Sequence, residues 1–309
     1  MKSNTKIKVV GVGGSGGNAI SRMKKCKIEG VELVAVNADA QDLKKIKADA
    51  KVRIGKKITQ GLGTGMNPDI GRQAAEEQRE EIEEVLKDSD MVFVTCGMGG
   101  GTGSGASPVV AEIAKSLGAL TVAIVTKPFS FEGQVRSHVA ENGLRRLKEK
   151  VDSLIVISND KLLEILDPNT ALLSAFWICD DTLRQAVKGI SDLIMLPGIV
   201  NVDFANIKTI MANSGTALFG IGRAQGEKRA EEAALRAINS PLLDINLRGA
   251  KGILFNVSGG KDISLSEIDE VAKVICQEIN PEAKVIFGAV LDEKLKKGEI
   301  KVTVIATGF

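Results

Sequence analysis

Apolar residues in the first half of the chain form short continuous runs that alternate with segments of helical periodicity. The runs are rich in Val and Ile and cover residues 7–12, 31–36, 91–96, 120–126 and 153–157. Continuous hydrophobicity is typical of parallel strands that are buried on both faces, and a helical segment between consecutive strands supplies the crossover. The pattern predicts a doubly wound α/β domain around a parallel sheet.

The second half of the chain has a different pattern. Residues 170–196 are apolar apart from one polar stripe, and Pro197 and Gly198 follow them, which predicts one long helix. From about Ser214 the strand-like runs are fewer and longer, which predicts a smaller α+β domain. We therefore expect an α/β domain over residues 1–170, a central helix with its following loop over 171–213, and a C-terminal domain over 214–309.

Composition excludes several classes of protein. The 309 residues are 44% apolar, carry a net charge of +2 and include only 3% aromatic residues, which argues against a nucleic-acid-binding surface. Four widely spaced cysteines without a C-x-x-C pair fit a reducing cytoplasm, and no apolar run approaches the ~18 residues of a membrane span. His138 is the single histidine and lies in a polar helical segment, so a Ser-His-Asp triad or a multi-histidine metal site lacks its parts.

The loop from Gly97 to Gly105 carries the clearest chemical signal. It follows the apolar run 91–96, precedes a helix-like segment, and has six glycines in nine positions. Glycines allow positive φ angles and expose backbone N–H groups, and the start of a helix adds its positive dipole end. The loop is expected to bind an anion, most plausibly phosphate.

A second loop, Gly11 to Asn18, contains G-x-G-x-x-G between a strand and a helix. Alone it is typical of a dinucleotide-binding domain, with Asn37 and Asp39 near the place of the expected acidic residue, and so an NAD(P)-dependent oxidoreductase is one alternative. One pyrophosphate needs only one such cradle, however, and two cradles predict a chain of phosphates. Because no G-x-x-x-x-G-K-[ST] motif is present, backbone groups and Thr102 are expected to hold the phosphates without a lysine.

Two further segments have an open interpretation. The third glycine-rich stretch, 61–68, either closes over the far phosphate or is an ordinary loop. The acidic segment 69–88 is interpreted as a solvated helix face.

These loops occur together with the segments 127–133, 158–163 and 201–206, and in this combination the chain resembles the FtsZ family of bacterial cell-division GTPases, which are relatives of tubulin. GMGGGTGSG is the tubulin-type signature, and the likeness extends from about Ile7 to Phe309. The resemblance implies a tubulin/FtsZ-like fold in which the central helix joins the GTP-binding domain to the C-terminal domain.

The resemblance also implies an activity. Subunits of the family stack head to tail into the filaments of a cytoplasmic ring at midcell, and the GTP of one subunit is hydrolysed to GDP when a loop of the next subunit completes the site. Such heterologous contacts grow filaments and not closed dimers. We therefore expect GTP or GDP with Mg²⁺ held through the phosphates, and further copies of the chain as the main partner.

The family's site residues carry over position by position. The first phosphate loop corresponds to Gly13, Gly14, Ser15, Gly16, Gly17 and Asn18, and the β/γ-phosphate cradle to Gly100, Gly101, Thr102 and Gly103. The γ-phosphate sensor corresponds to Thr64, Gly65 and Met66, and the residues near the nucleotide and its Mg²⁺ correspond to Asn37 and Asp39. The pair that contacts ribose and phosphates corresponds to Glu132 and Arg136. The residues that contact the base correspond to Phe176, Asn159 and Asp180.

Chemistry supports part of this assignment. A carboxylate such as Asp180 accepts both the N1–H and the amino group of guanine, whereas adenine offers no such pair of donors on that edge, so GTP is favoured over ATP. Glu132 and Arg136 are four residues apart, on one face of a helix expected to begin there, but they could equally be a surface ion pair.

The chain departs from the family at two places. The family has acidic residues at the positions of Asp203 and Asn206, which act on the water attacking the neighbouring subunit's GTP; here the second is an amide, which cannot accept a proton. We expect assembly with weak hydrolysis, and the chain is then a GTP-binding filament subunit more than an enzyme, unless Asp203 suffices. Family members also continue into a linker and a peptide that recruits membrane tethers, so a chain ending at Phe309 is expected not to bind those tethers.

Overall fold

The computed structural model describes residues 5–28, 30–164, 166–167, 169–196, 198–200, 202–240, 247–292 and 295–309. The described residues form two compact units, 5–188 and 189–309. None of the described helices has both the length and the hydropathy needed to span a membrane.

The sheet of the first unit is wholly parallel, as the apolar runs predict. Its strands lie in the order β3-β2-β1-β4-β5-β6. Their bounds are β1 Ile7–Val12, β2 Val31–Asn37, β3 Ala50–Arg53, β4 Met91–Gly97, β5 Leu120–Lys127 and β6 Ser153–Ser158. The strand order reverses between β1 and β4, and the crevice at the carboxyl ends of two such strands is where ligands bind in doubly wound folds.

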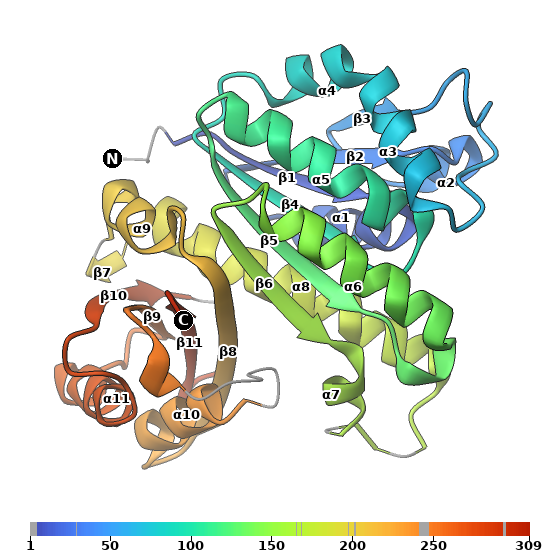
Figure 1. The fold of residues 1–309 in the computed structure, drawn as a ribbon. Helices are drawn as coiled ribbons and strands as arrows, with labels where there is room; N and C mark the ends of the chain where they lie inside the picture. Colours follow the sequence, from blue (N-terminus) through green and yellow to red (C-terminus); the bar gives the residue numbers. More distant parts are fainter. Residues whose placement is uncertain are drawn as a thin grey trace. The chain divides into compact units, whose positions relative to one another are not determined.

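Helices cover both faces of this sheet (Figure 1). They are α1 Gly13–Cys26, α2 Ala40–Lys45, α3 Pro68–Glu77, α4 Arg79–Leu86, α5 Gly101–Ser116, α6 Gln134–Lys148 and α7 Asn159–Leu163, with the short helix η1 Ser130–Glu132 before α6. Helices α1 and α5 lie on opposite faces, and buried aliphatic side chains of α5, such as Val110 and Ile113, pack in the core with Val92 and Val94 of β4. Because α1 and α5 start directly after β1 and β4, both begin at the crevice where the strand order reverses.

The acidic segment 69–88 presents its charged side chains on a solvated face, as interpreted from the sequence, but it is two helices and not one. It forms α3 and α4, which are separated at Gln78, a buried residue whose side-chain oxygen accepts hydrogen bonds from the backbone N–H groups of Gly55 and Lys56. Helix α3 also packs closely against α5, since a side chain at Gly71 or Gly105 would meet the backbone of the other helix. Only its outer face is solvated.

The expected long helix is α8, Leu172–Met195, which runs from the first unit into the second. The second unit has a mixed sheet in the order β8-β11-β9-β10-β7, with β9 and β10 parallel and the other pairs antiparallel. The bounds are β7 Gly198–Val200, α9 Phe204–Met211, β8 Gly215–Gln225, α10 Arg229–Ile238, η2 Leu247–Gly249, β9 Gly252–Gly259, α11 Leu265–Gln277, β10 Lys284–Leu291 and β11 Glu299–Thr307.

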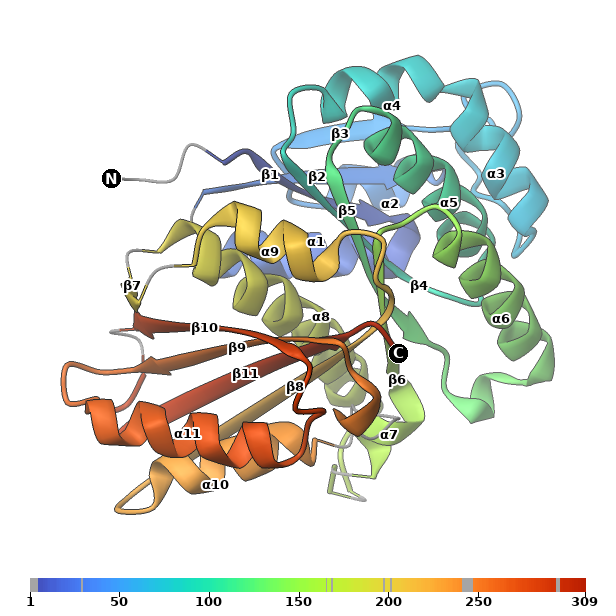
Figure 2. The same cartoon turned by 60° about the vertical axis from the view of Figure 1, so that its left-hand side comes forward.

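Two helices, α10 and α11, lie on one face of this second sheet (Figure 2). Their apolar faces share a core with β9 and β11 that includes Phe255, Val271 and Val302. Ser264 begins α11 with a capping box in which its hydroxyl accepts the Glu267 N–H. The second unit is therefore an α+β domain, as the sequence predicts.

Candidate functional site

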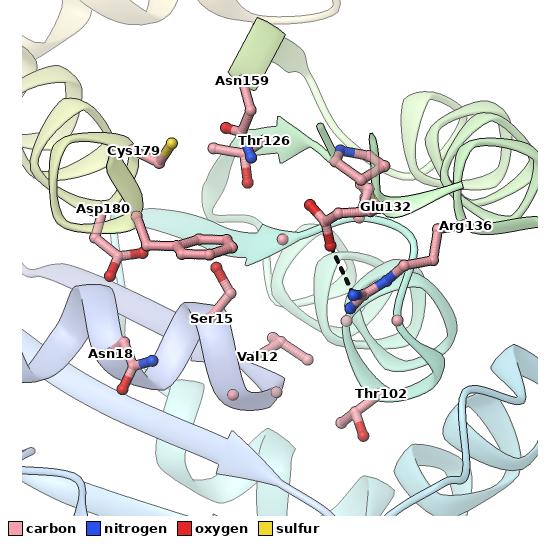
Figure 3. A pocket seen from close by; sticks show the side chains of 18 of the residues that line it. Val12, Ser15, Asn18, Thr102, Thr126, Glu132, Arg136, Asn159, Cys179 and Asp180 are labelled. Atoms are coloured by element: carbon pink, nitrogen blue, oxygen red, sulfur yellow. Dashed lines mark hydrogen bonds and ion pairs between the residues drawn. The ribbon is translucent and has the colours of Figure 1, made fainter. Parts of the chain in front are cut away.

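A cavity of about 590 Å³ opens at the carboxyl ends of β1 and β4, within the first unit (Figure 3). Most of the residues carried over from the family line it. They are Gly13, Gly14, Ser15, Asn18, Thr64, Gly100, Gly101, Thr102, Gly103, Glu132, Arg136, Asn159, Phe176 and Asp180. Figure 3 shows Asp180 at one end of the cavity and Thr102 at the other.

Two helix N-termini form the Thr102 end of the cavity. Helix α1 begins at Gly13 and α5 at Gly101, and the residues before them, Val12 and Gly100, make no side-chain cap hydrogen bond. The first-turn N–H groups of both helices are therefore not taken by a cap, and both positive dipole ends face the same space. This arrangement suits an elongated anion such as a polyphosphate.

The glycines of these loops serve mainly close packing, which corrects the expectation of positive φ angles. In the two loops only Gly13 and Gly99 have positive φ, 73° and 97°. A Cβ at Gly103 would lie 2.5 Å from the carbonyl oxygen of Gly97, and one at Gly16 would lie 2.5 Å from that of Thr95. The glycines let α1 and α5 approach the sheet, and this approach brings their N-termini together.

The loop before α3 reaches the cavity through one residue. Thr64 is buried, and its hydroxyl oxygen lies 3.2 Å from that of Thr102. Gly65 and Met66 do not line the cavity, and Met66 is half exposed with a φ of 63°. Of the three residues of the expected phosphate sensor, the structure thus places only Thr64 at the cavity.

Glu132 and Arg136 form an ion pair on the wall of the cavity, with 2.6 Å between Oε2 and Nη1. Glu132 also accepts the Phe129 N–H at 2.9 Å. The two residues do not share a helix as expected, because Glu132 ends η1 and Gly133, at a φ of 98°, separates it from α6. Since both side chains line the cavity, the pair is not merely a surface ion pair.

The other end of the cavity has one aromatic wall and two buried polar side chains. Phe176 packs edge-on against Phe129, with 5.4 Å between ring centroids. Asn159 is buried, and its Oδ1 has no hydrogen-bond partner among the described residues. Asp180 is buried as well. Its Oδ2 accepts a hydrogen bond from Arg22 Nε at 3.1 Å and forms an ion pair with Arg22, with 2.9 Å between Oδ2 and Nη2. This end suits a flat ring with N–H donors and polar acceptors on its edge.

Burial shifts the pKa of both titratable groups here. It raises the pKa of Asp180 to about 6, although the Arg22 charge and hydrogen bonds act in the opposite direction. Burial, and next the charge of Asp180, raise the pKa of the neighbouring Cys179 thiol to about 12. At neutral pH the cavity therefore holds an ionised carboxylate beside an unreactive thiol.

Four carried-over residues of the first unit do not line the cavity, besides Gly65 and Met66. Gly16 and Gly17 are buried within α1, packed against β1 and Ile46. The side-chain oxygen Oδ1 of Asp39 accepts the N–H groups of Gln41 and Asp42, both at 2.9 Å, which caps α2. Asn37 donates to Asp42 at 2.8 Å. The polar side chains of Asn37 and Asp39 thus have a local structural role, which is to hold the start of α2.

Asp203 and Asn206 lie in the second unit, at the start of α9, and both are exposed. The Asn206 N–H donates to the Asp203 carbonyl at 2.9 Å, and the Asp203 side chain makes no cap hydrogen bond to the helix. The cavity is lined by residues of the first unit alone. Asp203 and Asn206 therefore belong to one unit of the chain, and the cavity belongs to the other.

Sequence reasoning gave no role to five lining residues, namely Arg22, Thr126, Pro128, Leu173 and Cys179; three others, Val12, Gly97 and Met98, lie within the two glycine loops that it singled out. Some of the five leave a signal. Arg22 follows Asn18 by one helical turn, and Thr126 and Pro128 lie at the carboxyl end of β5, next to β4. Leu173 and Cys179 give no chemical signal, because apolar side chains on a wall look like core residues.

Comparison with known proteins agrees with this geometry. The GTPase-domain model of the Tubulin/FtsZ family matches residues 6–167, and the C-terminal-domain model of the FtsZ family matches residues 215–309. An FtsZ dimer from M. jannaschii is 52% identical, with a TM-score of 0.95 over 99% of this chain and 89% of that one. An FtsZ W319Y mutant from the same organism is also 52% identical, with a TM-score of 0.94 over 98% and 91%.

A more distant structure shares the fold. CetZ2 from Haloferax volcanii, described as a GTPγS-bound protofilament, is 21% identical with a TM-score of 0.82 over 98% of this chain and 92% of that one. Because the M. jannaschii proteins are archaeal, the expected bacterial origin gains no support from these comparisons. With one family model over the cavity-bearing unit, a second over the C-terminal sheet and half of all positions identical to an FtsZ, the chain belongs to the Tubulin/FtsZ family.

Proposed function

We propose that this chain is a self-assembling GTPase of cell division, which binds GTP in the cavity of the first unit and stacks head to tail into filaments. The observation that carries the proposal is the cavity itself. It places two uncapped helix N-termini at one end and a buried carboxylate with a buried amide at the other, which suits the polyphosphate and the base of a guanine nucleotide.

In this proposal the phosphates lie against the first turns of α1 and α5. Backbone N–H groups of both loops donate to phosphate oxygens, and the hydroxyl of Thr102, which lies close to that of Thr64, adds a side-chain donor. Arg136 and Glu132 meet the ribose and phosphates from the side. The dipoles of two helices favour a ligand with several negative charges over a single phosphate.

The base lies between Phe176 and the polar residues of the same end. Asp180 accepts the N1–H and amino donors of guanine, and the unpartnered Oδ1 of Asn159 is available to a further donor. Adenine has no matching pair of donors on that edge, so a buried carboxylate would remain unsatisfied and ATP would be disfavoured.

Magnesium enters this scheme with the nucleotide. Among the described residues no group of three or more His, Cys, Asp or Glu side chains could hold a metal ion. We expect the ion to take its ligands mainly from phosphate oxygens and water, as Mg²⁺ does in many nucleotide sites, and to offset the phosphate charge.

Hydrolysis, in this proposal, uses residues of two subunits. Asp203 and Asn206 are exposed at the start of α9, on a different unit from the cavity, and so are suited to reach the nucleotide of a neighbouring copy. Asp203 orients the water that attacks the γ-phosphate and accepts its proton, while Asn206 can only position it. The M. jannaschii FtsZ dimer and the CetZ2 protofilament show that relatives self-associate.

A second candidate function shares the same site. Asn206 is an amide where the family has a carboxylate, which favours a filament subunit that binds GTP and hydrolyses it slowly. Sedimentation and phosphate release measured together separate the candidates. An active GTPase pellets with GTP and releases phosphate, whereas a slow GTPase pellets with GTP and releases little phosphate.

The same experiment tests the whole proposal with GDP and ATP as controls. We expect pelleting with GTP, little with GDP and none with ATP. If the protein pellets equally with ATP, or calorimetry detects no binding of GDP or GTP, the proposed function is wrong. Binding of NAD(P) without any guanine preference would instead support an oxidoreductase.

A further inference from the structure

Arg22 joins α1 to α8 at the base end of the cavity. Its Nε and Nη2 atoms lie 3.1 and 2.9 Å from the same atom, Oδ2 of Asp180. Its guanidinium carbon lies 5.7 Å from the ring centroid of Trp177, which is three residues before Asp180 on the same helix. The guanidinium group is therefore held by two side chains of one face of α8, through an ion pair and a cation–π contact.

This contact leaves the other carboxylate oxygen of Asp180 for a ligand. The Nε hydrogen bond and the Nη2 ion-pair contact of Arg22 both involve Oδ2, and Oδ1 accepts no hydrogen bond from the described residues. The Asp180 side chain is only 10% exposed and it lines the cavity. A carboxylate fixed on one oxygen has its plane set, so the direction in which its remaining lone pairs point is set as well.

We propose that Arg22 is a positioning residue for base selection, which holds the carboxylate of Asp180 ionised and oriented so that it meets the N–H donors of guanine. The inference rests on the proposed function, because it explains how the same cavity selects its base. Arg22 acts through Asp180 and not by its own contact with the base.

The charges around Asp180 support this role. Arg22 from α1 is the cation that contacts it; the other groups that face this end are the neutral Cys179 thiol of α8, Asn159 of α7, and Glu132, whose charge is paired with Arg136. Burial already raises the pKa of Asp180, and Arg22 opposes that rise. Removal of Arg22 would raise the pKa of the carboxyl further, and the protonated carboxyl would donate a hydrogen bond where guanine also donates.

The test compares the affinities of GDP and ADP for the nucleotide-free protein by calorimetry, at pH 7.5 and pH 8.5. The variants are R22M, which removes the charge, and R22K, which keeps the charge without the planar guanidinium that contacts Asp180 and Trp177. K25M is the matched control, because Lys25 is an exposed cation of the same helix with no described ion pair. Thermal unfolding of each variant measures the structural contribution of the side chain.

For R22M we expect the GDP affinity to fall by about 10- to 100-fold, the factor for losing hydrogen bonds to a charged group, while ADP affinity stays within about threefold. Part of the loss should return at pH 8.5, where Asp180 ionises again. R22K should fall between R22M and the parent chain, and K25M should match the parent chain.

A purely structural role for Arg22 gives a different result. In that case the affinities for GDP and ADP both fall, and thermal stability falls with them. The GDP-to-ADP affinity ratio of R22M then equals that of the parent chain at both pH values, and this result overturns the inference. If R22M fails to fold, the ratio for R22K decides in the same way. Failure of the proposed function is recognised separately, because the parent chain itself would then not prefer GDP to ADP.

Discussion

At the scale of single residues, Asp180 is a buried carboxylate with a raised pKa, and pH therefore tests its role. Its pKa is raised to about 6. Below that value the carboxyl is protonated, and one of its oxygens becomes a donor where guanine also donates, so the GDP-to-ADP affinity ratio should fall about tenfold between pH 7.5 and pH 5. Calorimetry with both nucleotides measures this ratio, and ADP controls for the titration of the phosphates.

Unfolding does not explain such a loss. The folded protein binds the Asp180 proton more tightly than the unfolded chain, whose pKa is near the ordinary 3.8, so at this residue stability rises as the pH falls from about 6 towards 4. A ratio that stays constant from pH 7.5 to pH 5 would remove Asp180 from base recognition.

Asn206 carries the prediction about rate. It is exposed in the first turn of α9, so replacement by Asp disturbs no buried contact. We expect N206D to raise GTP turnover by ~10² or more, since a proton acceptor commonly contributes that factor, with nucleotide-dependent sedimentation unchanged. Phosphate release measures the turnover, and equal rates for N206D and the parent chain would show that Asp203 alone is sufficient.

At the scale of elements, the cavity depends on how closely α3 and α5 pack. A Cβ at Gly105 would collide with the Pro68 carbonyl oxygen and approach the Arg72 nitrogen of α3. G105A should therefore lower the free energy of unfolding by about 1–3 kcal/mol, although alanine favours a helix by about 1 kcal/mol over glycine.

Urea denaturation measures this effect, and Gly100 offers the matched control. A Cβ there meets no atom within 4 Å, and its φ of −96° suits any residue, so G100A should change stability by less than about 0.5 kcal/mol. If G105A and G100A are equally stable, α3 and α5 adjust freely and the packing argument is wrong.

The elements also show how far the sequence could predict this molecule. Strand β1 and the start of β4 agree with the apolar runs because both are buried on two faces, whereas β3, Ala50–Arg53, was not predicted: it is an edge strand in which only Val52 is buried. The break at Gln78 was missed for a similar reason, since it depends on hydrogen bonds to a loop more than twenty residues away. Hydrophobic periodicity reports burial of whole elements and not contacts between distant segments.

The same limit applies to the site. The glycine loops were predictable, because strands that end at one edge of a parallel sheet bring their following loops together. The Arg22–Asp180 pair joins residues 158 positions apart, and neither side chain alone indicates the other. Asn37 and Asp39 have the residue types for a nucleotide contact, which stays a prediction; what the structure adds is that both hold the N-terminus of α2.

At the scale of the whole molecule, the proposed function places nucleotide binding and hydrolysis on different units of the chain. The cavity belongs to residues 5–188, whereas Asp203 and Asn206 belong to 189–309. If each nucleotide is hydrolysed with the help of a neighbouring copy, a subunit in isolation binds GTP without turning it over. Hydrolysis then depends on protein concentration in a way that binding does not.

We therefore expect GTP turnover per chain to fall towards zero on dilution below the concentration at which filaments sediment, while GTP binding persists there. The physical reason is mass action: a head-to-tail contact supplies Asp203 only when two copies are associated. Release of labelled phosphate across a dilution series measures turnover, and filter binding measures occupancy. D203A is the control, since it should bind GTP and sediment but show negligible turnover at every concentration. A turnover per chain that is constant through the dilution series would mean that one copy holds the complete site, and Asp203 would then have no role in a neighbour's nucleotide.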